Sequence, residues 1–176
     1  MKRALSAMLA CALALPVTVA AQDAPLPPAQ WGILFGPQIV TGPFTGAFRT
    51  GAVFGLLGNV PITPQRLSLR LDATYHWMND QSNSNRFSWI LSGSADLIVR
   101  AKDRGAEWSP YALAGVAVYG FGDSEGSIQF YHPKHFGLEG GVGVEFREPH
   151  HTTFIEARYQ SIPPGGVIPI VLGFRY

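Results

Sequence analysis

Charged side chains recur at alternate positions of this sequence, and residues with that spacing share one face of an extended strand. Arg70 is followed by Asp72, and Glu156 by Arg158, so opposite charges lie on the same face. Such groups can pair with one another, because arginine binds carboxylates through a fixed fork of donors, or they can line a selectivity constriction or a proton-linked site. Because the signs alternate, we favour a mutually paired network. Its candidate members are Arg49, Arg70, Asp72, Asp96, Arg100, Glu139, Glu145, Arg147, Glu156, Arg158 and Arg175.

Other residues have side chains suited to metal binding or to nucleophilic catalysis. His132 and His135 lie in one connection, with Asp123 and Glu125 nearby. Two histidines at this spacing are weak evidence for a metal without further fixed ligands. Ser161 has no adjacent histidine, and a serine without a base is a weak nucleophile. We therefore expect no metal, no cofactor and no catalytic residue.

The elements that carry these residues are predicted from a period of two in the apolar residues, which is the pattern of β-strands. In "RLSLRLDATYHW" the leucines share one face with Tyr75 and Trp77, and Arg70 and Asp72 share the other. Turn sequences rich in Gly, Pro, Asn and Asp separate similar segments. The pattern predicts eight strands at residues 31–40, 46–58, 66–77, 86–100, 109–121, 135–147, 152–161 and 167–176.

Eight alternating strands fit two architectures. A soluble sandwich or lipocalin-like barrel buries its apolar face, whereas a membrane barrel turns that face to lipid and its polar face to the lumen. The strand lengths match a tilted membrane crossing of about 9–11 residues, and aromatic residues crowd the strand ends. We predict an all-β fold, an eight-stranded antiparallel up-and-down transmembrane β-barrel. The aromatic residues expected to face outward are Trp31, Tyr75, Trp77, Phe87, Trp89, Tyr119, Phe121, Phe136, Phe174 and Tyr176.

The start of the chain has the pattern of a secretory signal peptide. Lys2 and Arg3 precede an apolar run that ends in small residues, which predicts a signal peptide at residues 1–21. Residues 22–30 form a Pro-rich leader, and residues 31–176 form the barrel domain. Without Lys2 and Arg3 the 13 basic residues become 11 against 12 acidic ones, a net charge of −1. No basic surface for nucleic acid is therefore expected.

The final strand, "PIVLGFRY", resembles the C-terminal strand of bacterial outer-membrane proteins, with alternating outward apolar residues and a terminal aromatic. "SPYALAGVAVYGF" and "FGLEGGVGVEF" are similar to the Gly-rich strands of the small outer-membrane β-barrel domain family, the OmpA/OmpX-like group. The resemblance implies that Phe174 and Tyr176 are the signal read by the barrel-assembly machinery, although Phe is usual where Tyr176 stands. It also implies a bacterial outer-membrane location, contact with outer-membrane lipid and both chain ends in the periplasm.

Some eight-stranded outer-membrane barrels modify lipid A, and the lipid A deacylases carry a His–Ser pair near the outer end of a late strand. The comparable place here reads Tyr159, Gln160 and Ser161, and His76 belongs to a distant strand. We therefore expect a non-enzymatic barrel, plugged by charged side chains, with a structural, envelope-integrity or surface-interaction role. A lipid A-modifying enzyme and a small pore are the alternatives. The loop at residues 122–134 is the candidate contact for a surface partner.

Overall fold

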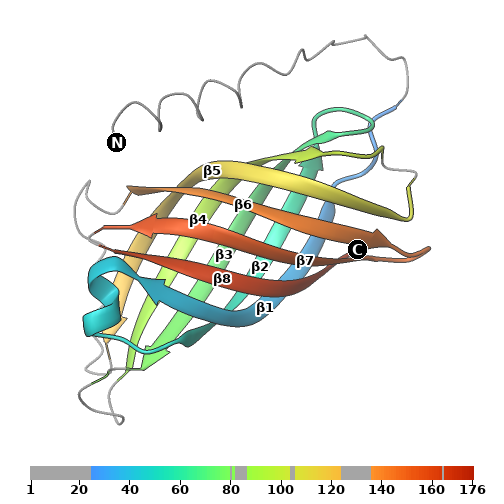
Figure 1. The fold of residues 1–176 in the computed structure, drawn as a ribbon. Coiled ribbons are helices and arrows are strands. Elements are labelled where there is room, and N and C mark those ends of the chain that lie inside the picture. The colour runs from blue at the N-terminus through green and yellow to red at the C-terminus, as the bar shows by residue number, and fades with distance from the viewer. Residues whose placement is uncertain (1–24, 80, 82–86, 104–105, 124–135, 164) are drawn as a thin grey trace, which may run out of the picture.

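The alternation of apolar and polar residues produces a closed antiparallel ring in which each strand pairs with its neighbours in sequence and β8 returns to β1 (Figure 1). The computed structural model describes residues 25–79, 81, 87–103, 106–123, 136–163 and 165–176. The predicted signal peptide and the start of the predicted leader lie outside these residues. The strands are β1 (Gln30–Thr41), β2 (Gly51–Pro61), β3 (Leu67–Asn79), β4 (Phe87–Arg100), β5 (Trp108–Asp123), β6 (Phe136–Arg147), β7 (Thr152–Ile162) and β8 (Gly165–Arg175).

The predicted strand at residues 46–58 is wrong at its start, because β2 begins only at Gly51. A 3-10 helix, η1 (Gly42–Gly46), precedes it. Gly42 has a φ of 63°, a left-handed conformation that glycine adopts without a steric penalty. The turn that follows buries Phe44 inside the barrel. The other predicted strands differ from the observed ones by about two residues at most, the usual uncertainty at an element's ends. Across the residues described, we find no helix with the length and apolar character needed to span a membrane.

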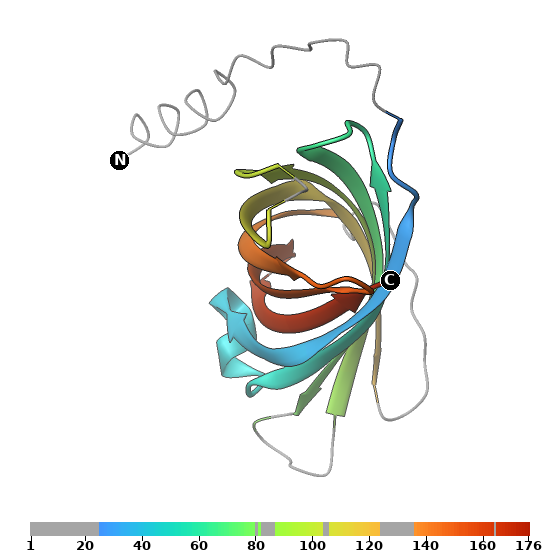
Figure 2. The same cartoon turned by 90° about the vertical axis from the view of Figure 1, so that its right-hand side faces the viewer.

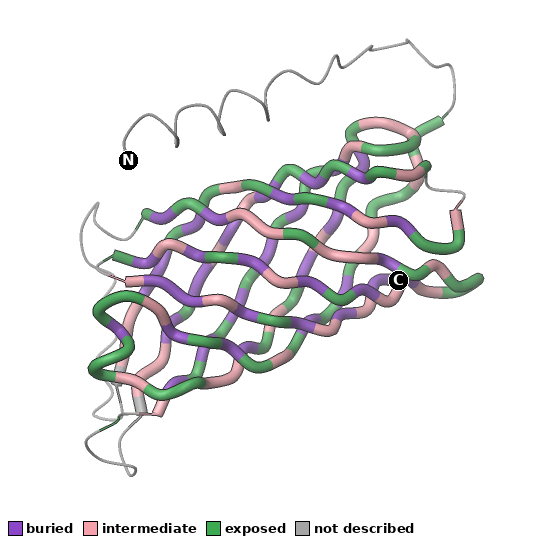
Figure 3. Tube along the Cα trace, viewed as in Figure 1, coloured by how far each residue is buried: buried purple, intermediate pink, exposed green. Residues whose placement is uncertain are grey.

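Burial alternates along most strands, as the period-two pattern requires (Figure 3). The exposed positions carry large apolar residues. Leu56 is 65% exposed and Leu138 is 69% exposed, whereas Arg70 is 1% exposed. A water-soluble protein has the opposite distribution. Large apolar side chains around the outside and charges within are the arrangement of a transmembrane β-barrel.

Two of the aromatic residues expected on the outside face the interior instead. Tyr119 is buried, and Phe121 is half-buried against the same inner apolar cluster. They lie on β5, where both faces carry small or apolar residues, so hydrophobicity does not distinguish the two faces. Phe87 is described only in its backbone.

The first and last strands meet at one end of the barrel, which we call the termini end (Figure 2). The amide of Trp31 donates to the carbonyl of Tyr176 at 3.2 Å, and the amide of Tyr176 donates back to the carbonyl of Trp31 at 2.9 Å. Because successive strands are antiparallel, the connections β2–β3, β4–β5 and β6–β7 also lie at this end. η1 and the remaining connections lie at the opposite end.

Candidate functional site

The inward side chains of β7 cross the interior from one end to the other, because an extended strand turns every second residue to the same face. The order begins at the termini end and runs Thr152, Phe154, Glu156, Arg158, Gln160 and Ile162. Charged, polar and apolar layers therefore follow one another inside the barrel. We name two of them: the central network (Arg70, Asp72, Asp96, Glu139, Glu156 and Arg158) and the mouth cluster (Arg100, Glu145, Arg147 and Arg175).

Glu156 is the hub of the central network. Arg70 donates to both of its carboxylate oxygens, from Nη1 at 2.8 Å and from Nη2 at 3.0 Å. The Nε of Arg158 donates to Oε1 at 2.7 Å, and the hydroxyl of Tyr111 donates to Oε2 at 2.7 Å. A two-point arginine–carboxylate pair is stronger and more directional than a single contact. Four donors thus hold one buried carboxylate in place.

The other central carboxylates surround the same two arginines. Asp72 accepts from the Nη1 of Arg158 at 2.8 Å, and its Oδ2 lies 3.2 Å from the Nε of Arg70. Asp96 lies 3.7 Å from both guanidinium groups, and Glu139 lies 3.8 Å from Arg158. The pairs join strands on opposite sides of the barrel, so the network fills the middle of the interior.

Apolar side chains fill the interior on either side of these charges. One cluster contains Leu34, Val53, Phe154 and Val171 among others. The guanidinium carbons of Arg70 and Arg175 lie 6.0 Å and 5.5 Å from the centre of the Phe154 ring, within range of a cation–π contact. Phe154 therefore stands between the central network and the mouth cluster.

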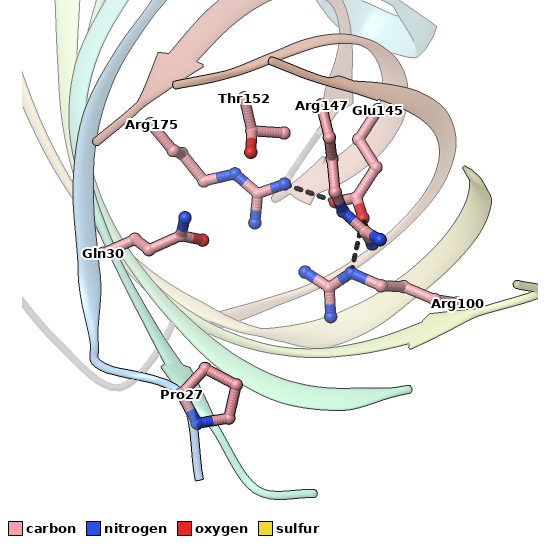
Figure 4. Close-up of a pocket in the computed structure, with 7 residues that line it drawn as sticks. All are labelled: Pro27, Gln30, Arg100, Glu145, Arg147, Thr152 and Arg175. Carbon is pink, nitrogen blue, oxygen red and sulfur yellow. Dashed lines mark hydrogen bonds and ion pairs between the residues drawn. The ribbon is translucent and has the colours of Figure 1, made fainter. Parts of the chain in front are cut away.

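In the mouth cluster, three arginines share one carboxylate. The Nε of Arg100 donates to Oε1 of Glu145 at 2.8 Å. Arg147 donates to the same oxygen, and Arg175 donates to Oε2. A cavity of about 210 Å³ opens beside them at the termini end (Figure 4). It is lined by Pro27, Gln30, Arg100, Glu145, Arg147, Thr152 and Arg175.

Most of the charged residues expected in the lumen lie in one of these two groups, and Arg49 is the exception. Arg147 is at the rim and half-buried. Arg49 is exposed in the connection between η1 and β2. Its position in the lumen was inferred from a strand starting at residue 46, and the backbone at Arg49 is not part of the strand. Its amide instead donates to the carbonyl of Asn79 at 2.9 Å.

A polar row near the opposite end was not predicted as a group. His76 is fully buried; its Nδ1 donates to the amide oxygen of Gln38 at 2.6 Å. Its Nε2 lies 2.9 Å from the hydroxyl of Thr74, which also contacts the hydroxyl of Ser92. The sequence indicates this polar row only through the alternation of Thr74 and His76 with apolar residues.

Ser161, which was considered as a nucleophile, lies on β7, where it pairs with Gly166 of β8.

The residues that were considered as metal ligands and set aside include Glu125, His132 and His135, which lie outside the described residues. Nearly all of the loop at residues 122–134 lies outside them as well. Within the part of the chain that is described, no three His, Cys, Asp or Glu side chains are grouped so that they could hold a metal ion.

The structure is similar to solved structures of small outer-membrane barrels. Neisserial surface protein A has a TM-score of 0.64 and 18% identity, over 85% of this chain and 98% of that chain. The N-terminal β-barrel domain of Pseudomonas aeruginosa OprF has a TM-score of 0.54 and 16% identity, over 84% and 97%. Ail, the attachment invasion locus protein of Yersinia pestis, has a TM-score of 0.52 and 15% identity, over 84% and 97%.

No family model matches the sequence, and no curated protein matches it. Identities this low show a common fold and leave the activity open. The chain therefore has the fold of the small eight-stranded outer-membrane β-barrels.

Proposed function

We propose that this chain is a non-enzymatic integral protein of the bacterial outer membrane, with a structural, envelope-integrity or surface-interaction role. The observation that carries the proposal is the central network. Its side chains are at most 2% exposed and span the middle of the barrel. Eight strands enclose an interior just wide enough for side chains to fill. A lumen filled in this way favours a plugged barrel over a channel.

The lengths of the connections support an orientation with the termini end in the periplasm. Outer-membrane barrels have short periplasmic turns and longer extracellular loops. The connections at the termini end are residues 62–66, 101–107 and 148–151, and those at the opposite end are residues 42–50, 80–86, 124–135 and 163–164. The long connection at residues 124–135 joins β5 to β6 at the opposite end. In this orientation the loop at residues 122–134 faces outside, where it is available to a surface partner.

The burial of the hydroxyl groups that contact the imidazole of His76 also favours a role without catalysis. Thr74 and Ser92 are buried together with His76 inside the barrel. An acyl chain of a lipid would have to enter the filled interior to reach them. Mass spectrometry of lipid A from cells with and without the protein tests this directly. We expect identical acyl patterns, and a changed pattern would establish the enzymatic alternative.

The plugged lumen is tested by recording from the purified protein in a planar bilayer. We expect no steady, ion-selective conductance, because the buried side chains of the central network occupy the middle of the barrel. Glu156→Ala and Asp103→Ala serve as a buried and an exposed substitution. Stable conductance steps in the unaltered protein, with a selectivity that Glu156→Ala alters and Asp103→Ala does not, would identify a pore instead.

The surface-interaction role is tested by a pull-down with intact cells. The full-length protein is compared with a variant shortened within residues 123–133, whose insertion is first checked by its heat-modifiable migration. We expect the shortened variant to lose a surface partner that the full-length protein retains. Equal capture by both proteins would exclude this loop as the contact.

A further inference from the structure

Positive and negative charges are unevenly divided along the barrel. The central network contains two arginines and four carboxylates. The mouth cluster contains three arginines, which share the single carboxylate of Glu145. Among the described residues that line the cavity there is thus a formal excess of two positive charges. The apolar cluster around Phe154 separates this excess from the acidic excess in the centre.

Two of the three arginines have further partners that hold them in position. Arg100 donates from Nη1 to the hydroxyl of Ser68 at 2.8 Å. Arg147 donates from Nη1 to the carbonyl of Asp103 at 2.9 Å. These contacts position both guanidinium groups at the edge of the cavity without neutralising their charge.

The guanidinium group of Arg175 has one buried donor without a partner in the described part of the chain. It is 4% exposed, and its Nε is buried without a hydrogen-bond acceptor among the described residues. Figure 4 shows its guanidinium extending into the cavity between Thr152 and Gln30. A buried cationic donor without an acceptor is costly. An anion in the cavity beside this guanidinium group would offset that cost through its charge.

We infer that this cavity binds a phosphate-type dianion. Arginine presents planar pairs of donors that match the oxygens of phosphate. A phosphate monoester carries about −1.5 to −2 charges at neutral pH, which matches the excess of two positive charges better than one carboxylate does. The hydroxyl of Thr152 and the amide of Gln30 add neutral donors at the wall. This site goes beyond the proposed role and does not depend on it, because a plugged and a conducting barrel have the same mouth.

The cavity volume limits the ligand to a small group. At about 210 Å³ it is smaller than the usual range of about 300–1,000 Å³ for drug-sized ligands. It accommodates one phosphate group, with the rest of any larger molecule outside the mouth. The phosphate can belong to a soluble molecule or to the monoester headgroup of a lipid.

The site is tested by titrating inorganic phosphate into the full-length protein, purified in zwitterionic detergent, at constant ionic strength set with chloride. Calorimetry should detect saturable binding. We expect Arg175→Gln to weaken binding at least tenfold. Arg66→Gln is the matched control, because the side chain of Arg66 is exposed, pairs with the carboxylate of Asp103 and is not among the residues that line the cavity. It should change the affinity less than twofold.

Removal of the Glu145 carboxylate should change the phosphate affinity in the opposite direction, which provides a second test. Its carboxylate competes with a bound anion for the same three arginines, so Glu145→Gln should tighten phosphate binding severalfold. A purely structural role for the cluster would leave binding unchanged or abolish it. If Glu145→Gln does not fold, as judged by heat-modifiable migration, the comparison of Arg175→Gln with Arg66→Gln decides.

The proposal would be overturned if the unaltered protein showed no saturable phosphate binding, or if Arg175→Gln and Arg66→Gln weakened phosphate binding equally. It would also be overturned if acetate bound as tightly as phosphate at the same site. Nanodiscs then distinguish the two sources of phosphate. If phosphatidic acid blocks the phosphate titration and phosphatidylglycerol at equal charge does not, the ligand is a lipid monoester headgroup. If neither lipid blocks it, the ligand is a soluble phosphate.

Discussion

A single carboxylate, that of Glu156, binds both arginines of the central network and the hydroxyl of Tyr111. Burying so many charges is unfavourable unless each has partners of good geometry. Once they are buried, the loss of one partner costs far more than the pair itself contributes, because it leaves an uncompensated charge in a medium of low polarity. The stability of the interior therefore depends strongly on individual residues.

Glu156→Ala should lower the free energy of unfolding by about 3–5 kcal/mol, because it leaves three buried guanidinium donors of Arg70 and Arg158 without the carboxylate that accepts from them. Urea unfolding in detergent, followed by tryptophan fluorescence, measures the change. Asp103→Ala breaks an exposed pair with Arg66 and should cost at most about 1 kcal/mol. Equal losses of unfolding free energy in the two variants would mean that the buried network contributes no more to stability than an exposed ion pair.

Gly173 lies where the ring of Phe154 needs space. A Cβ at Gly173 would lie 2.1 Å from the Cζ of Phe154, so Gly173→Ala should cost about 1–3 kcal/mol of unfolding free energy through overpacking. Gly58→Ala is the control, because nothing lies within 4 Å of the corresponding Cβ. The double variant Gly173→Ala with Phe154→Leu should cost less than the sum of the single changes. Strict additivity in urea unfolding would show that the two residues do not collide.

The strands of the barrel depend on closure between β1 and β8. Ile33 pairs with Phe174, and Gly32 pairs with Arg175, close to the reciprocal backbone hydrogen bonds of Trp31 and Tyr176. Without this ladder the barrel would have two open edges in the membrane, where unsatisfied backbone groups have no water to bind. The last three residues thus complete the sheet as well as carrying the proposed assembly signal.

Deletion of Phe174–Tyr176 should strongly reduce the amount of folded protein in the membrane, since it removes both outward aromatic residues and the end of the closing ladder. The measurement is the fraction of membrane-embedded protein with heat-modifiable migration. Tyr176→Phe is the control and should keep normal levels, because the aromatic ring and the backbone remain. Normal levels after the deletion would contradict the assembly role.

The sequence predicted the strands well because a period of two depends only on local backbone geometry. It did not predict η1, which depends on the positive φ of Gly42 and on space for Phe44 inside the closed barrel. Nor did it predict which charges pair. Arg70 and Glu156 are 86 positions apart, so their contact depends on closure and on the register of every intervening strand. Apolar residues inside the lumen, such as Leu34 and Val53, were not predicted. A period of two assigns residues to two faces of a strand, but it does not determine which side chains pack together inside the barrel.

The whole molecule has an apolar outer surface around a charged interior, and its exposed residues include Leu56, Leu138 and Ile155. This surface is stable only in an apolar medium, because in water each such side chain would lose the benefit of burial. The position of the barrel in the bilayer is therefore set by the band in which these side chains lie.

Leu56→Arg tests the lipid-facing band in the middle of β2. In lipid vesicles it should cost about 2–4 kcal/mol of unfolding free energy, because a charge at mid-membrane depth loses its hydration. Val60→Arg, on the same face near the end of β2, should cost about 0–1 kcal/mol. Urea unfolding in vesicles measures both. The same cost at both depths would place this surface outside the bilayer.

Closure of β8 onto β1 also means that the finished barrel is cyclic. Each strand has two neighbours, and the backbone contacts of Trp31 and Tyr176 bring the two ends of the ring as close together as consecutive strands. A circular permutant, with residues 31 and 176 joined and the chain opened at another turn, would have the same ladders, the same interior and the same surface. The pairing of the described strands therefore does not distinguish a first strand from a last one. Any difference between the natural chain and such a permutant in the yield of folded protein would therefore arise before the ring is closed, in the order in which the strands pair.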